Sequence, residues 1–155
     1  MGQDVKDFIR KHEGEWYSPN EIHNETKSDL RTVKNSVSRL TKTSYWTTYE
    51  GYRVEIAQRE DRIYCVRLVK DIENSVRLIK EEMAEVEGIK ENIESVRDVD
   101  LGLLEKHSSC YAVRDAIRYH FQHSDLKRLR TDIRDLKESK LEQLREYLQE
   151  LGGHP

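Results

Sequence analysis

The sequence lacks the disulfide-forming cysteines and long apolar segments that are typical of secreted and membrane proteins. Its 155 residues include seven glycines, two prolines and two cysteines. Two isolated cysteines, Cys65 and Cys110, do not make a disulfide framework, so we expect a reducing, cytoplasmic setting. No apolar run is long enough for a signal peptide or a membrane span, and we therefore expect no membrane association.

The motifs of the common catalytic sites are also missing. The sequence has no glycine-rich phosphate loop, no His-Glu-x-x-His pair and no nucleophile-elbow serine. Acidic residues are abundant, but they alternate with Lys and Arg as on solvated helix surfaces. The sequence therefore predicts no enzyme and no cofactor.

Charge is what the sequence has in excess, with 37% charged residues against 35% hydrophobic ones. This composition is typical of long surface helices and coiled coils. Residues 1–69 have 12 basic and 11 acidic side chains, whereas residues 70–155 have 15 and 19. Because an acidic surface repels polyanions, the first part is the candidate for binding nucleic acid.

The most informative stretch is residues 28–42, which predict an amphipathic helix. At 100° per residue its apolar side chains share one sector: Leu30, Val33, Val37 and Leu40. Ser28 is the expected N-cap, and Asp29 suits the positive end of the helix dipole. Hydrogen-bond donors occupy the opposite face, with five basic residues and one acidic residue between Lys27 and Lys42. Such a face fits a DNA major groove, although a solvated amphipathic helix has the same pattern.

Two shorter helices precede this stretch. The first begins near Asp4 and ends at Gly14, and residues 15–17 suggest a brief extended segment. Ser18-Pro19-Asn20-Glu21 then forms a capping box with proline at the first helical position. This second helix holds Ile22 inward and ends near Glu25, so a tight turn joins it to the basic helix. The result is a helix-turn-helix.

Strand signals follow over residues 45–49, 52–56 and 63–69, which are rich in aromatic and β-branched side chains. Turn material at residues 50–51 and 58–62 separates them. Two hairpin tips are consistent with this pattern. The first turn would present Tyr49 and Arg53, and the second would present Arg59 and Arg62. In either case an arginine is available to a phosphate.

The order of these elements resembles the winged helix-turn-helix domains of bacterial and archaeal transcription regulators. The resemblance depends on Ser18-Pro19-Asn20-Glu21-Ile22, on Leu30-x-x-Val33-x-x-x-Val37-x-x-Leu40 and on the strand-rich segment, and it covers under half of the chain. It implies that Arg31, Thr32 and Asn35 approach base edges in the major groove. It also implies that Lys42 and the hairpin arginines contact phosphates.

The second part of the chain predicts long coiled-coil helices over residues 70–97 and 124–151. Apolar residues recur there at spacings of three and four, from Ile72 to Val96 with a shortened step at Gly88, and from Leu126 to Leu136 with the pattern resuming from Leu144 to Leu151. About 28 residues at 1.5 Å each give roughly 42 Å per helix. The two helices could pair within one chain or with a second copy, and a homodimer is the expectation.

Residues 98–123 form a connecting helical segment that contains the one metal-like arrangement, His107-x-x-Cys110 with His120-x-x-His123. Imidazole and thiolate are suitable zinc ligands, but exposed histidines at a helix junction would produce the same residue pattern without a metal. Tyr111, Tyr119 and Phe121 could line a pocket for a small-molecule effector. Core or dimer packing is the commoner use of such aromatics.

The sequence thus predicts a mostly α protein with an α+β head: a winged helix-turn-helix domain over residues 1–69 and a coiled-coil dimerisation region over residues 70–155. The expected function is that of a homodimeric, sequence-specific regulator of transcription that binds double-stranded DNA. The alternative is a protein-docking module without nucleic acid. The predicted DNA-binding residues are Lys27, Arg31, Thr32, Lys34, Asn35, Ser38, Arg39, Lys42, Arg53, Arg59 and Arg62.

Overall fold

The computed structural model describes residues 2–42, 45–60, 62–92, 106–107, 115, 117–119, 122–123 and 125–152. The chain divides into two compact units, Met1–Ile79 and Lys80–Pro155, and the division falls inside helix α5. The described residues are mostly helical with one two-stranded antiparallel sheet, in line with the predicted mostly α protein with an α+β head. Within the described parts, no helix is both long and apolar enough to cross a bilayer.

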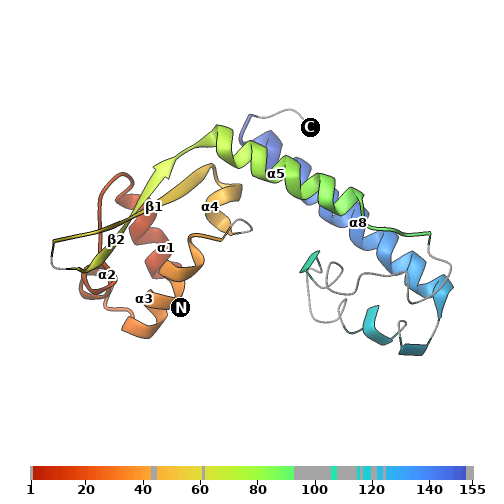
Figure 1. The fold of residues 1–155 in the computed structure, drawn as a ribbon, viewed down its shortest axis with the longest axis horizontal. Helices are drawn as coiled ribbons and strands as arrows, with labels where there is room; N and C mark the ends of the chain where they lie inside the picture. The colour runs from red at the N-terminus through yellow and green to blue at the C-terminus, as the bar shows by residue number, and fades with distance from the viewer. Residues whose placement is uncertain are drawn as a thin grey trace. The chain divides into compact units, whose positions relative to one another are not determined.

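The first unit contains three helices, a one-turn helix and a hairpin, and it leads into α5 (Figure 1). The bounds are α1 Gly2–Lys11, α2 Pro19–Thr26, α3 Leu30–Arg39, α4 Trp46–Tyr49, β1 Tyr52–Gln58, β2 Tyr64–Lys70 and α5 Ile72–Glu87. The predicted extended segment between α1 and α2 is confirmed, because Tyr17 exchanges two backbone hydrogen bonds with Val66 of β2, at 3.0 and 2.8 Å.

The start of α2 is capped as predicted. Ser18 Oγ accepts a hydrogen bond from the Glu21 amide at 3.2 Å, and Pro19 occupies the first helical position. A serine N-cap of this kind contributes about 1 kcal/mol, because it satisfies an amide that the helix itself leaves unpaired. The direction of α2 is therefore set locally, before any tertiary contact forms.

The predicted cap of α3 is wrong. Asp29, not Ser28, is the N-cap residue, and its side chain makes no capping hydrogen bond. The backbone of Lys27 is left-handed (φ 57°), and this turns the chain so that the Ser28 carbonyl accepts a hydrogen bond from His23 Nδ1. The turn between α2 and α3 is therefore fixed by a strained lysine and a histidine rather than by a serine cap.

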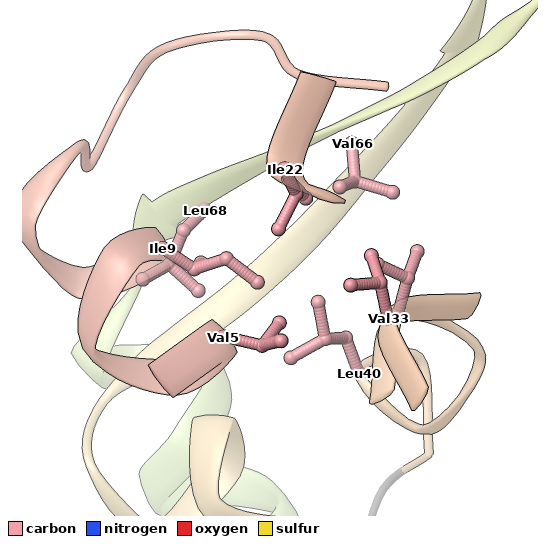
Figure 2. Close-up of a cluster of buried hydrophobic side chains, with 8 residues drawn as sticks. Val5, Ile9, Ile22, Val33, Leu40, Val66 and Leu68 are labelled. Carbon is pink, nitrogen blue, oxygen red and sulfur yellow. The ribbon is translucent and has the colours of Figure 1, made fainter. Parts of the chain in front are cut away.

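The core of the first unit lies between α1, α2, α3 and β2. Its buried members are Val5, Ile9, Ile22, Val33, Val37, Leu40, Val66 and Leu68. Figure 2 shows the side chains of Val5, Ile9 and Ile22 pointing toward those of the third helix and the strand. The predicted inward face of α3 is confirmed for Val33, Val37 and Leu40, whereas Leu30 is only half-buried.

Residues 45–49 do not form the predicted strand. Trp46–Tyr49 is a single helical turn, α4, in which the Glu50 amide donates to the Trp46 carbonyl at 2.9 Å. Thr47 and Thr48 are buried here, and Thr47 Oγ1 donates to the Leu40 carbonyl at 3.4 Å. Burial against the end of α3 therefore overrides the β-propensity of these residues.

The hairpin is a single pair of strands, in the register that runs from Tyr52 opposite Lys70 to Gln58 opposite Tyr64. Of the two predicted turns, the second one forms the tip. The Arg59 amide donates to the Ile63 carbonyl at 2.9 Å, and Arg62 adopts a left-handed backbone (φ 66°). The turn at Gly51 only leads from α4 into β1.

The second unit contains the end of α5 and the helix α8, Leu126–Glu150. The predicted helix 124–151 agrees with α8 to within two residues. The predicted helix 70–97 is too long, because α5 ends at Glu87 and residues 88–92 are not helical; residues 93–97 lie outside the described residues. Most of the predicted connecting segment also lies outside them.

Helix α8 and the end of α5 pair antiparallel within this unit. Lys140 lies 3.7 Å from Glu82, and Lys137 Nζ donates to the carbonyls of Glu87 at 3.2 Å and Ile89 at 2.8 Å. Lys137 thereby satisfies backbone acceptors that are left open at the end of α5. The apolar stripe of α8 is buried in the chain itself, through Leu129, Ile133, Leu136, Leu144 and Leu148.

Candidate nucleic-acid interface

Helix α3 presents a polar face whose position is fixed by the burial of the opposite one. Val33 and Val37 are 0% and 2% exposed, so the side chains about half a turn away must point to solvent. The exposed side chains of the helix are Arg31, Lys34, Asn35, Ser38 and Arg39. Lys42 is exposed just beyond the end of the helix, and Thr32 at its flank is half-buried.

None of the basic side chains on this surface is neutralised within the described part of the molecule. Lys27, Arg31, Lys34, Arg39 and Lys42 make no side-chain hydrogen bond and no ion pair there, and the Asn35 side chain is also without a partner. We call these five cations and Asn35, with Thr32 and Ser38, the α3 surface. Its donors are available to an external anion or base edge.

Basic residues elsewhere in the first unit are mostly paired with acids. Lys6 and Arg10 share Glu50, at 3.5 and 3.4 Å. Arg53 Nε donates to Asp71 Oδ2 at 2.9 Å. Arg67 binds Glu55 and also lies over the Trp16 ring, at 4.7 Å from its centroid. The unpaired charge is therefore concentrated on the α3 surface.

The hairpin arginines occupy three different environments. Arg53 is at the start of β1, at the base of the hairpin, where Asp71 and Glu55 hold it. Arg59 is in the turn and pairs with Glu21 of α2. Arg62, also in the turn, is exposed, and its side chain has no partner among the described residues. Of the three predicted phosphate contacts, only Arg62 is both at the tip and unpaired.

The acids of the hairpin pairs are ionised at neutral pH. The hydrogen bond from Arg59 holds the pKa of Glu21 below its ordinary value. The pKa of Glu55 is lowered mainly by its hydrogen bonds from Arg67, with a further contribution from Arg53. The sequence did not predict that these two carboxylates would neutralise arginines of the hairpin. Glu21 and Arg59 are 38 positions apart, and only their charge signs hinted at a pair.

A second polar cluster lies between α1 and the extended segment. Tyr17 donates to Glu15 at 2.6 Å, and His12 Nδ1 lies 3.0 Å from the same carboxylate. The hydrogen bond to Glu15 raises the pKa of Tyr17 to about 12, so the hydroxyl stays protonated at neutral pH. The hollow beside this cluster holds no more than a water molecule, which is too small for an effector.

The predicted metal ligands fall partly outside the described residues, which exclude Cys110 and His120. His107 is buried, with its ring nitrogens 3.9 Å from Glu82 and 3.4 Å from Glu85. His123 is exposed and stacks on Tyr119, with ring centroids 4.1 Å apart. In the part of the chain that the structure describes, no three His, Cys, Asp or Glu side chains are placed to share a metal ion. The effector residues Tyr111 and Phe121 are likewise not described.

Comparison with protein families, curated proteins and solved structures found no match to this chain. The geometry and chemistry of the α3 surface are therefore what bears on the function of this chain.

Proposed function

We propose that the first unit is a winged helix-turn-helix that binds double-stranded DNA sequence-specifically. In this proposal α3 enters the major groove, and the β1–β2 turn lies against the phosphate backbone. The element order of helix, extended segment, two helices and hairpin supports it. We further propose a role in transcription regulation in the cytoplasm, in line with the expectations from the sequence.

The observation that carries the proposal is the exposed and unpaired α3 surface. An arginine can donate two hydrogen bonds to guanine, and asparagine can bond adenine in the same two-point manner. Arg31 and Asn35, one helical turn apart on the free face, are the proposed base readers, with Thr32 beside them. Lys27, Lys34, Ser38, Arg39 and Lys42 are the proposed phosphate contacts.

A homodimer is part of the proposal, because two heads double the phosphate contacts and read a palindromic site. The stripe of α8 that favoured dimerisation is covered within one chain, so a second copy must use another surface. The mass in solution tests this point. We expect twice the 18.4 kDa of one chain, and a monomer would remove the two-headed arrangement.

Selection of duplexes by the purified protein, followed by salt-dependent binding, tests DNA reading. Arg31→Ala should weaken the binding free energy for the selected duplex by about 1–3 kcal/mol more than that for a random duplex. Lys42→Ala should weaken both alike. Lys11→Ala removes from α1 a cation that is also exposed and has no ion-pair partner among the described residues, and it serves as the matched control. An equal loss on both duplexes for Arg31→Ala would refute base reading.

The second candidate function is protein docking. Its support is the nearly balanced charge of residues 1–69 and three exposed apolar side chains near the hairpin tip: Ile56, Ile63 and Tyr64, exposed by 56%, 40% and 41%. Phosphate contacts are strongest at low salt. Absence of duplex binding at low salt would therefore favour docking over DNA binding.

A further inference from the structure

The hairpin turn is tied to α2 by an arginine–carboxylate pair. Arg59 Nη1 donates to Glu21 Oε1, and Arg59 Nη2 donates to Glu21 Oε2 at 3.4 Å. Glu21 is in the first turn of α2, which packs against α3, and Arg59 is in the β1–β2 turn. The pair therefore ties the proposed phosphate-binding turn to the helix that packs against α3.

Because the pair is exposed, it contributes little to folding stability. It nevertheless competes with a DNA phosphate for the Arg59 guanidinium. The side chains of Arg59 and Glu21 are 42% and 39% exposed, and exposed ion pairs contribute roughly 0–1 kcal/mol to folding. A guanidinium uses the same planar donors for a carboxylate as for a phosphate. Arg59 must release Glu21 before it can bind a phosphate in this manner.

We propose that Glu21 masks Arg59 and so limits the affinity of the interface for DNA phosphates. This inference rests on the proposed function. While Glu21 is ionised, Arg59 contributes no net contact, and the carboxylate repels the backbone next to the turn. Specificity then depends on the α3 surface, because one of the sequence-independent contacts is suppressed.

Arg62 provides the internal comparison. It belongs to the same turn but has no partner among the described residues, so its charge is unmasked. Arg62→Ala should lower the salt slope of duplex binding by about 0.9, the value for one phosphate contact. Arg59→Ala in the otherwise unchanged protein should leave the slope as it is.

Glu21→Gln is the decisive variant, because it removes the charge and keeps the side-chain size and the amide that Ser18 caps. We expect tighter binding to selected and random duplexes and a log–log salt slope steeper by about 0.9. The double variant Glu21→Gln with Arg59→Ala should return to the original slope. Glu25→Gln is the matched control: Glu25 is an exposed carboxylate of the same helix, and it has no hydrogen-bond or ion-pair partner among the described residues.

The outcomes are separable. If Glu21→Gln changes the slope no more than Glu25→Gln does, the masking role is wrong and DNA binding stands. A gain that persists in the double variant also overturns masking, since Arg59 would not be its source. If no variant binds any duplex at low salt, the proposed function fails and the masking proposal fails with it. Thermal unfolding by circular dichroism verifies that each variant is folded.

Discussion

The α3 surface and the β-hairpin both carry basic residues, but most of those on the hairpin are paired with acids. Arg53, Arg59 and Arg67 of the hairpin each bind a carboxylate. The five cations from Lys27 to Lys42 bind none in the described part of the molecule. The number of basic residues therefore does not identify a polyanion-binding surface, and their neutralisation by neighbours decides it.

The largest effect should come from loosening the apolar face that holds the α3 surface in place. Leu40→Ala removes a side chain that is 4% exposed, and the free energy of unfolding should fall by about 2–5 kcal/mol. Arg39→Ala, its exposed neighbour, should change it by less than about 0.5 kcal/mol. Denaturant unfolding measures both. Equal losses would mean that α3 is not held by its apolar face.

Removing one arginine from the α3 surface and one from the hairpin tests whether pairing with an acid prevents phosphate binding. Arg39→Ala should lower the salt slope of duplex binding by about 0.9, because an unpaired cation is lost. Arg53→Ala should leave the slope unchanged, because Asp71 and Glu55 already neutralise that guanidinium. Titrations at several salt concentrations give both slopes. A loss of slope for Arg53→Ala would show that paired hairpin arginines also bind phosphates.

Substitution of Lys27 should affect folding stability and duplex binding in opposite directions. A left-handed backbone costs an L-residue about 1–2 kcal/mol relative to glycine, which in turn loses more chain entropy on folding. Lys27→Gly should therefore raise the free energy of unfolding by about 0.5–1 kcal/mol and weaken binding to all duplexes. Lys27→Asn retains some left-handed preference and lacks the charge. Stabilisation without loss of binding would remove Lys27 from the α3 surface.

The smallest effect should appear on acidification. The pKa of Glu55 is lowered in the folded protein, so its contribution to stability is present above the ordinary glutamate pKa and is lost as the pH falls through the folded value. The advantage of the wild type over Glu55→Gln should thus begin to fall near the ordinary glutamate pKa of about 4.3 and should be lost once the pH is below the pKa of the folded protein. Thermal unfolding across this range measures the difference. The α3 surface, which has no acid partner in the part of the chain that the structure describes, should not contribute to this difference.

Much of the fold was predictable because its signals are local. The capping box at Ser18 and the spacing from Val33 to Leu40 required only neighbouring residues, and both predictions are confirmed. The predictions for residues 45–49 and for the Ser28 cap are wrong. In both cases a contact with a residue outside the local pattern overrode the local preference. Thr47 is buried and bonds the Leu40 carbonyl, and His23 forms a hydrogen bond with the Ser28 carbonyl.

The sequence by itself determined which side chains of α3 face outward, because the period of its apolar residues leaves only one face to bury. It also located the basic surplus between Lys27 and Lys42. Only the tertiary structure decided which cations are neutralised. Pairs such as Glu21 with Arg59 form across 38 residues, when the hairpin folds back over α2. Charge pairing depends on distance in space, and no local pattern encodes it.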